Sequence, residues 1–342
     1  MNIFITGGAG FIGSNFIRYV LDHRNDAFIV NFDNLTYAGN LENLTDVSQK
    51  YSDRYVFYRG DICDGELVRK VLKTRTIDVI INFAAETHVD RSIISSDVFI
   101  QTNIIGTKIL LDAALDAKIP LFIQISTDEI YGSLGPTGKF TEESQIKPNS
   151  PYSASKAAAD HLVRAYYKTY GLPAIITRCS NNYGPYQFPE KFIPLFITNA
   201  LEDKPLPLYG SGKNIRDWIF VDDHSAAVLA ILQNSRPGEV YNIGGGYEKE
   251  NRDVAEEILT ILGKPMSLLT FVTDRPGHDL RYAMDYTKIN RELNWRPQMP
   301  FDQGLGLTID WYKEHTDWVN RIKTKEYLQY YELNYGFRRV LS

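Results

Sequence analysis

The chain has 342 residues, of which 44% are hydrophobic and 23% are charged, and its 37 basic and 42 acidic residues leave a net charge of -5. This balance is typical of a globular protein with one or two domains. Because no basic excess is present, we expect no nucleic-acid partner.

Short apolar runs alternate with helix-length segments over the first 180 residues. Runs rich in Ile, Val and Phe predict buried strands at Ile3–Thr6, Ala27–Phe32, Arg54–Tyr58, Asp78–Phe83, Leu121–Ser126 and Ala174–Arg178. Helices are predicted at Phe11–Asn25, Gly65–Thr74, Val98–Ala117 and Tyr152–Tyr170. Such alternation implies βαβ units, and hence an α/β, Rossmann-type doubly wound parallel sheet with helices on both faces.

The segment Thr6–Gly13 follows the first predicted strand and opens the first helix, with glycines at Gly7, Gly10 and Gly13. This spacing allows a tight turn, a close approach of the main chain to a pyrophosphate and close packing of the helix, whose N-terminus faces the phosphates. Asp33 lies about 20 residues further on, where a carboxylate binds a ribose 2′-hydroxyl, so the pattern predicts NAD rather than NADP. A turn without a ligand is the alternative.

Other residues also follow predicted strands and so face the same crevice. Asp61 and Ile62 come after the third strand and would cap the adenine. The fourth strand is followed by the run Phe83, Ala84, Ala85 and Glu86, whose small residues leave room beneath a cofactor.

Prolines and glycines cluster from Asn181 onward, and the alternation becomes irregular. We therefore expect an NAD-binding Rossmann domain over residues 1–180, with a returning segment around 218–245 that includes a strand at Val240–Ile243. A smaller, mixed substrate-binding domain is expected over residues 181–217 and 246–330. The segment after Trp311 is helical in texture, and we assign it only to packing or subunit contacts.

Tyr152 and Lys156 lie four residues apart at the start of a predicted helix, so they share one face. A tyrosine that acts as a base needs a lowered pKa, which an ammonium one turn away provides, and the lysine can also hold the nicotinamide ribose. A surface helix contact is the alternative. The glycine motif upstream favours the active-site interpretation.

Thr127, Asp128 and Glu129 follow the fifth predicted strand. Thr127 suits a hydrogen bond to a substrate hydroxyl. Paired carboxylates beside a sugar indicate one protonated acid and one ionised base, which are the groups that an elimination requires. A solvated acidic loop is the alternative on position alone.

Together the motifs resemble the dTDP-glucose 4,6-dehydratase family of extended short-chain dehydrogenases, over most of the chain. They are the glycine motif and the runs that begin at Asp33, Ala84, Ser126, Tyr152, Asn181, Arg216 and Asp274. The adjacent Thr-Asp-Glu from Thr127 is the specific part, because related epimerases lack one or both carboxylates.

The resemblance implies dehydration of dTDP-glucose to dTDP-4-keto-6-deoxyglucose by internal hydride transfer through tightly bound NAD. Tyr152 would take the C4 hydroxyl proton as the C4 hydride passes to NAD, with Thr127 bonded to that oxygen. Glu129 would then remove the C5 proton while Asp128 protonates the departing C6 hydroxyl, and hydride returns to C6. The product would feed deoxysugar synthesis, with dTDP-rhamnose as the family expectation.

The resemblance also assigns contacts by motif position. Additional cofactor contacts would be Phe11, Ile12, Asn34, Leu35, Thr36, Thr102 and Asn182. Substrate contacts would be Thr87, Thr127, Asn181, Lys191, Phe192, Pro207, Tyr209, Arg216, Asn251, Arg275 and His278. Arginines suit a pyrophosphate because a guanidinium offers paired planar donors, and surface salt bridges are the alternative for them. The family is typically homodimeric, here through helices Val98–Ala117 and Tyr152–Tyr170.

Cys63 and Cys179 match no metal-ligand spacing, so we expect no metal site and no disulfide. The N-terminus offers no signal-peptide core, and no apolar run suggests a membrane span, so we expect a cytoplasmic protein with no membrane partner.

Three other functions stay open. They are a sugar-nucleotide 4-epimerase, a decarboxylase acting on UDP-glucuronate and a non-catalytic NAD-binding scaffold. The first two need no acid and base pair like Asp128 and Glu129, and the third has no use for both Tyr152 and Lys156. No motif distinguishes thymidine from uridine in the nucleotide.

Overall fold

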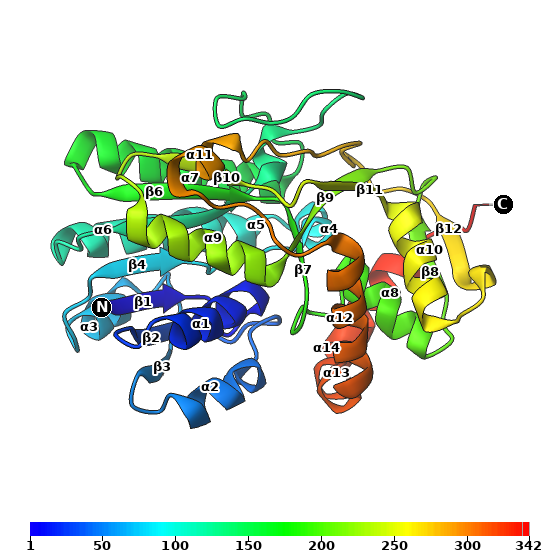
Figure 1. Ribbon diagram of the computed structural model, residues 1–342, viewed down its shortest axis with the longest axis horizontal. Coiled ribbons are helices and arrows are strands. Elements are labelled where there is room, and N and C mark those ends of the chain that lie inside the picture. The colour runs from blue at the N-terminus through cyan, green and yellow to red at the C-terminus, as the bar shows by residue number, and fades with distance from the viewer. Residues whose placement is uncertain (337, 342) are drawn as a thin grey trace.

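A seven-stranded parallel sheet forms the larger part of the molecule (Figure 1), in the order β10-β6-β5-β4-β1-β2-β3. The computed structural model describes residues 1–336 and 338–341. The strands are β1 Asn2–Thr6, β2 Phe28–Asp33, β3 Tyr55–Arg59, β4 Val79–Asn82, β5 Phe122–Thr127, β6 Ala174–Cys179 and β10 Val240–Ile243. These bounds closely match the predicted ones. Successive strands are added on one side of β1 as far as β3 and on its other side from β4 onward. This change of side between β1 and β4 places a ligand crevice at the carboxyl ends of these strands.

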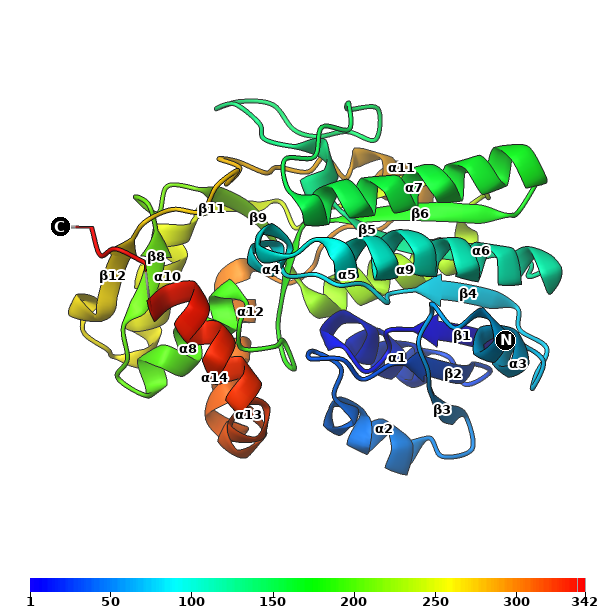
Figure 2. The ribbon, with the colours of Figure 1, turned by 180° about the vertical axis from the view of Figure 1, so that it is seen from behind.

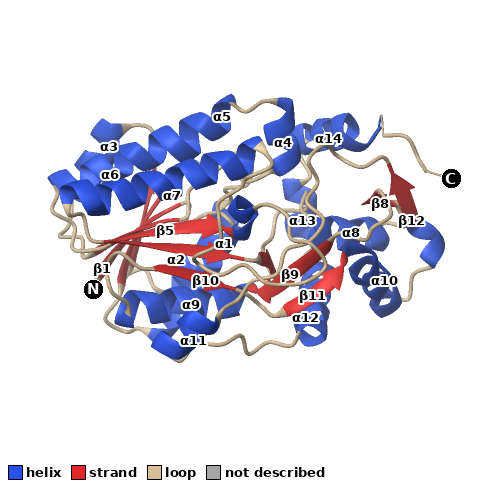
Figure 3. Cartoon of the chain, turned by 90° about the horizontal axis from the view of Figure 1, so that it is seen from above, coloured by secondary structure: helices blue, strands red, loops and turns tan. Residues whose placement is uncertain are grey.

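Helices cover both faces of this sheet, as the doubly wound prediction requires (Figure 3). One face carries α1 Phe11–His23, α2 Thr45–Lys50, α9 Val221–Asn234 and α11 Thr287–Leu293, with the 3-10 turn η1 Leu41–Leu44. The other face carries α3 Gly65–Leu72, α4 Val89–Ile94, α6 Thr107–Asp116 and α7 Pro151–Tyr170. The α/β fold class is therefore confirmed.

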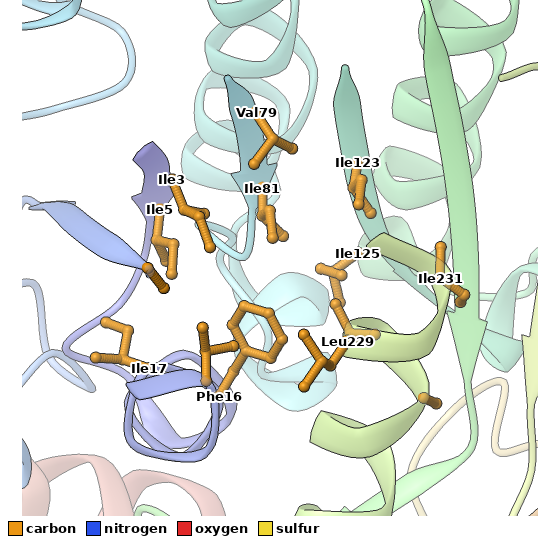
Figure 4. Close-up of a cluster of buried hydrophobic side chains, with 14 of the residues drawn as sticks. Ile3, Ile5, Phe16, Ile17, Val79, Ile81, Ile123, Ile125, Leu229 and Ile231 are labelled. Atoms are coloured by element: carbon orange, nitrogen blue, oxygen red, sulfur yellow. The ribbon is translucent and has the colours of Figure 1, made fainter. Parts of the chain in front are cut away.

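The core follows from the alternation of side chains along each strand. Ile3 and Ile5 of β1 pack with Phe16 of α1 in the cluster of Figure 4, on the α1 and α9 side. Phe4, between them in sequence, joins the cluster on the opposite face. These side chains are fully buried, and burial of each contributes about 2 kcal/mol. The sheet is thus fixed from both sides, which gives its carboxyl edge a rigid base.

A smaller unit lies beyond that edge and contains a mixed sheet in the order β11-β9-β7. Its strands are β7 Asn181–Tyr183, β9 Ile215–Phe220 and β11 Tyr247–Glu250, and a further pair is β8 Leu206–Tyr209 with β12 Leu269–Val272. Its helices are α8 Phe192–Leu201, α10 Asn251–Leu262, α12 Phe301–Glu314, α13 Thr316–Ile322 and α14 Lys325–Tyr331, with 3-10 turn η4 Met266–Leu268. Seen from behind, α14 lies beside α13 and α8 (Figure 2).

The predicted helix Val98–Ala117 differs from the structure in its middle. It consists of α5 Asp97–Phe99, a π-helical stretch Ile100–Gly106 and α6. The wider π turn lets Asn103 point inward, where its side chain bonds both main-chain groups of Glu86, at 2.9 and 3.0 Å. Local sequence patterns do not report such a turn, because it arises from this tertiary contact.

The same continuous stretch, Asp97–Asp116, is long and apolar enough to cross a membrane by length and composition alone, with a mean hydropathy of 1.3. The expectation that no apolar run suggests a span was therefore wrong for this segment. In the structure the stretch packs along α7 and α3, and 44% of it is buried.

Candidate active site

The turn between β1 and α1 has a shape that only glycine permits at two positions. Gly7 has a φ of +69°, and a Cβ there would lie 2.5 Å from the main-chain nitrogen of Ala84. A Cβ on Gly13 would collide with the carbonyl oxygen of Gly7. Gly10 is the N-cap of α1 and has no side chain to accept from the first-turn amides, so these donors are free for an anion.

Asp33 ends β2 and is 8% exposed, with both carboxylate oxygens bonded to main-chain amides. Oδ2 accepts from Ala9 at 2.9 Å and Oδ1 accepts from Leu35 at 2.8 Å. Burial raises the pKa of Asp33, and these two hydrogen bonds oppose that rise. The carboxylate therefore links the glycine turn to the loop after β2, beside the dinucleotide crevice.

A cavity of about 300 Å³ runs from the glycine turn to the end of β5. Its lining includes every residue predicted to contact the cofactor except Leu35, whose amide serves the Asp33 carboxylate. These lining residues are Gly7, Gly10, Phe11, Ile12, Gly13, Asp33, Asn34, Thr36, Asp61, Ile62, Phe83, Ala84, Ala85, Glu86, Thr102, Tyr152, Lys156 and Asn182. The glycine cradle, the free amides of α1 and the acidic end of β2 all fit a dinucleotide such as NAD.

Helix α7 presents Tyr152 and Lys156 to this cavity. Ser150 and Ser153 form a capping box at its start, and Pro151 occupies the first turn, so the position of Tyr152 is set by local sequence. Lys156 Nζ donates to the carbonyl oxygen of Ile125 at 2.7 Å. The lysine is thereby anchored to β5.

The electrostatics of Tyr152 differ from the sequence-based expectation. Burial raises its pKa well above the ordinary value, and the charge of Glu129 raises it further. Burial lowers the pKa of Lys156, which its neighbour Asp160 opposes. Desolvation therefore dominates over the lowering that we expected from the lysine.

The turn η3 Asp128–Tyr131 follows β5 directly and carries the two carboxylates. Thr127 caps it by accepting from the amide of Glu129 at 3.3 Å. Burial raises the pKa of Asp128 well above its usual value, and the Glu129 charge adds to this rise. Burial also raises the pKa of Glu129, but Arg275, Arg216 and Lys191 oppose the rise. Asp128 is thus the member of the pair that favours its protonated form.

A second cavity of about 160 Å³ opens toward the smaller unit, and it shares five lining residues with the first, which are Thr87, Glu129, Asn181, Glu190 and Lys191. Of the eleven predicted substrate residues, Thr127 lines only the first cavity, and the other ten line the second, three of them being shared with the first. Those in the second are Thr87, Asn181, Lys191, Phe192, Pro207, Tyr209, Arg216, Asn251, Arg275 and His278. Glu129 therefore lies where the two compartments meet.

Cations give the second cavity its character. Arg216 of β9 lies 4.4 Å over the ring of Tyr282, and its Nη2 donates to the carbonyl oxygen of Asp279 at 3.1 Å. Burial lowers the pKa of His278 to about 4, with Arg275 and Arg216 adding to this effect, so the imidazole is neutral near pH 7. A cavity lined by two guanidinium groups suits a diphosphate.

Several lining residues were not predicted. Asp90 of α4 is 5% exposed and pairs with Arg275 at 3.2 Å, while Tyr209 donates to it at 3.0 Å. Tyr335, in the π turn η5 Glu332–Gly336 after α14, also lines the second cavity and stacks on Tyr209 with ring centres 5.9 Å apart. Asp90 belongs to the motif run that begins at Ala84, whereas the sequence of the C-terminal segment does not indicate that Tyr335 reaches this cavity.

Neither cavity contains a cluster typical of a metal centre. In residues 1–336 and 338–341, no group of three or more His, Cys, Asp or Glu side chains is placed to hold a metal ion. Cys63 and Cys179 are both free thiols.

A doubly wound sheet with a glycine cradle after β1 and the Tyr152 and Lys156 pair on α7 defines an extended short-chain dehydrogenase. Comparison with known proteins narrows this class. The model of the GDP-mannose 4,6 dehydratase family matches residues 4–308, so the chain belongs to that family. The resemblance to nucleotide-sugar dehydratases is thereby confirmed.

Individual relatives are about 50% identical to this chain in sequence. A dTDP-glucose 4,6-dehydratase of Xanthomonas campestris is 50% identical over 341 residues, covering 94% of this chain and 96% of the relative. A crystal structure of dTDP-glucose 4,6-dehydratase from Bacillus anthracis in complex with NAD has 52% identity and a TM-score of 0.88, covering 94% of this chain and all of that one. The enzyme from Streptomyces venezuelae, solved with NAD and TYD bound, has 49% identity and a TM-score of 0.92 over the same shares.

Proposed function

We propose that the protein converts dTDP-glucose to dTDP-4-keto-6-deoxyglucose with a tightly held NAD. The observation that carries this proposal is the position of Asp128 and Glu129, between a dinucleotide cavity and a cation-lined cavity. A simple dehydrogenase or 4-epimerase has no use for an acid and a base at that junction. The relatives at about half identity bear the same activity in their names.

The first chemical step removes two hydrogens from C4 of the glucose. NAD would supply the hydride acceptor for this step and the hydride donor for C6 at the end. Tyr152 takes the C4 hydroxyl proton, and Thr127 donates a hydrogen bond to the same oxygen. Lys156 holds the ribose and contributes positive charge next to the tyrosine.

The C4 ketone makes the C5 proton acidic, so elimination follows oxidation. Glu129 is the base at C5, because Arg216, Arg275 and Lys191 favour its ionised form. Asp128 is the acid at C6, because burial keeps its proton on. Water leaves as Asp128 protonates the C6 hydroxyl, and Glu129 then returns its proton to C5.

The second cavity would hold the nucleotide diphosphate. Arg216 and Arg275 offer paired N–H donors to the phosphate oxygens, and Asp90 keeps Arg275 in place at 3.2 Å. Asn181, Lys191 and the neighbouring lining residues would contact the sugar. This binding positions the sugar, and the same cations favour the ionised form of Glu129.

The test uses dTDP-glucose in deuterated water, with the product followed by NMR. We expect a 4-keto-6-deoxy sugar with deuterium at C5, because the proton that Glu129 returns comes from exchange with solvent. Unchanged substrate or the 4-epimer would overturn the proposal. The same assay with UDP-glucose determines the preference for the base.

The proposal also covers the oligomeric state, the cellular location and the pathway of the protein. Ile94, Val98 and Ile105 expose 58%, 44% and 41% of their surface on the α4 to α6 side, which supports a homodimer through this face and α7. Two free thiols support a cytoplasmic location. We propose that the product enters deoxysugar synthesis, with dTDP-rhamnose as the expected end point.

A further inference from the structure

A buried ion pair lies behind the catalytic lysine. Asp160 of α7 and Arg178 of β6 are joined by a 3.0 Å bond between Oδ2 and Nε, and their side chains are only 1% and 6% exposed. Neither residue lines either cavity. The pair therefore does not touch substrate or cofactor, and its role has to be exercised through its neighbours.

Asp160 follows Lys156 by four residues on α7, which places the two side chains on one face, one helical turn apart. The second carboxylate oxygen of Asp160, Oδ1, is buried and has no hydrogen-bond partner. Attraction to Asp160 opposes the lowering of the Lys156 pKa by burial. The carboxylate thus lies one helical turn from the one charged group that α7 contributes to the site, and its other neighbour, the Ser126 hydroxyl, is neutral.

Arg178 connects the pair to the opposite side of the site. Its Nη1 donates to the Tyr131 hydroxyl at 2.8 Å, and that hydroxyl donates to Asn242 at 2.8 Å. Tyr131 belongs to the turn that carries Asp128 and Glu129. The ion pair therefore joins the helix of the tyrosine and lysine to the turn of the two carboxylates.

A buried ion pair is a weak reason for stability, because desolvation of the two ions offsets most of their attraction. We propose that Asp160 is a positioning residue for Lys156, and that its carboxylate, held by Arg178, maintains the charge of the lysine ammonium that the Ile125 carbonyl oxygen holds at 2.7 Å during hydride transfer. This inference rests on the proposed function, because it assigns Asp160 to the step that Tyr152 and Lys156 catalyse.

The other groups around Lys156 do not replace Asp160. Tyr152 and Cys179 face the lysine from α7 and β6, and burial raises the pKa of the Cys179 thiol to about 12, so the thiol is uncharged near pH 7. Asp128 and Glu129 lie on the Tyr152 side. Asp160 is the carboxylate that acts directly on the lysine charge.

The test follows the first hydride transfer alone, in a Glu129→Gln background that blocks elimination. Reduced-cofactor absorbance is recorded in single turnovers with dTDP-glucose over a range of pH. We expect Asp160→Asn to shift the basic limb of this rate profile to lower pH by about one unit, because Lys156 loses its proton more readily. Asp160→Glu keeps the charge, so the basic limb of its rate profile should return most of the way to the parental pH.

Two further variants keep the test decisive. Asp160→Asn leaves Arg178 buried without a counter-charge, so Asp160→Asn/Arg178→Met is prepared as well, and we expect a smaller shift in the same direction. Tyr131→Phe disturbs the same network without changing a charge, and its basic limb should stay at the parental pH. A folded Asp160→Asn protein whose basic limb stays at the parental pH would overturn the inference.

Failure of the proposed function would look different. If the Glu129→Gln protein with Asp160 intact produces no reduced cofactor from dTDP-glucose, the hydride step itself is wrong. If it produces the signal and the Asp160→Asn variant behaves like the parent, the positioning role alone is contradicted.

Discussion

Asp128 and Glu129 are adjacent in sequence, and burial raises the pKa of both, but more of the surrounding cations oppose the rise at Glu129. Asp128 is 2% exposed, with Oδ1 3.3 Å from the Thr127 hydroxyl and Oδ2 without a partner. Glu129 faces the cations of the second cavity. The difference is what an elimination needs, because one carboxyl has to donate a proton while its neighbour accepts one.

Glu129→Gln should separate oxidation from elimination. The amide cannot accept the C5 proton, so we expect turnover to fall about 100-fold or more while oxidation at C4 continues. Reduced cofactor should accumulate and be visible by absorbance on mixing with dTDP-glucose. A variant that turns over like the parent, without such a signal, would contradict the assignment.

Asp128→Asn provides the comparison for that experiment. It removes the acid at C6 but not the base at C5, so solvent deuterium should still enter C5 of bound sugar while loss of water slows. Equal loss of C5 exchange in both variants would contradict the division of roles.

Arg275→Lys should weaken substrate binding and leave the chemical steps nearly unchanged. Lysine keeps the charge beside Asp90 but loses the paired donors of a guanidinium, so we expect KM to rise about tenfold with kcat retained. Steady-state kinetics measure this. Arg338→Lys is the matched control, because Arg338 lies over the Tyr209 ring at 4.4 Å but is not part of the cavity lining.

Acid should destabilise the fold through its buried histidines. Burial lowers the pKa of His224 to about 3 and that of His88 to about 4. The unfolded chain binds these protons near the ordinary pKa of about 6.5, so stability falls as the pH drops below that value toward about 4.

The size of the effect is testable at His224, whose Nδ1 lies 2.9 Å from Asn182 Oδ1. His224→Gln should lower the slope of unfolding free energy against pH by about 1.4 kcal/mol per unit between about pH 4 and 6. Urea titrations at several pH values give the slope. The exposed His161→Gln variant is the control, and an unchanged slope in His224→Gln would contradict the prediction.

A charge on the exposed apolar face should prevent dimer formation. Val98→Asp places a carboxylate at a side chain that is 44% exposed, and sedimentation should then report a monomer. Leu307→Asp, at a side chain of α12 that is 48% exposed, is the matched control and should remain dimeric. A Val98→Asp protein of unchanged mass would contradict the proposed interface.

Much of the first compartment was predictable because its signals are local. Gly7 is required by its positive φ and Gly13 by its contact with Gly7, both within one turn, and Asp33 ends a strand at a fixed offset from them. The strands themselves were predicted because alternate side chains such as Ile3 and Phe4 are buried on both faces. The shared face of Tyr152 and Lys156 on α7 was predictable from helical periodicity alone.

The second compartment was less predictable because its contacts join distant segments. Asp90 and Arg275 are 185 residues apart, and only the folded chain brings them together. Tyr335 reaches the cavity from a tail whose composition resembles any surface helix. The π turn at Asn103 and the high pKa of Tyr152 likewise arise from burial against other elements, which no local pattern reports.

In the proposed catalytic cycle, one NAD stores the C4 hydride and returns it to C6 of the same sugar. The most direct test supplies dTDP-glucose deuterated at C4 and locates the label in the product by NMR. Internal hydride transfer predicts deuterium in the C6 methyl group of the 4-keto-6-deoxy sugar. Deuterium that remains at C4, or that is lost to solvent or to added NAD, would contradict it.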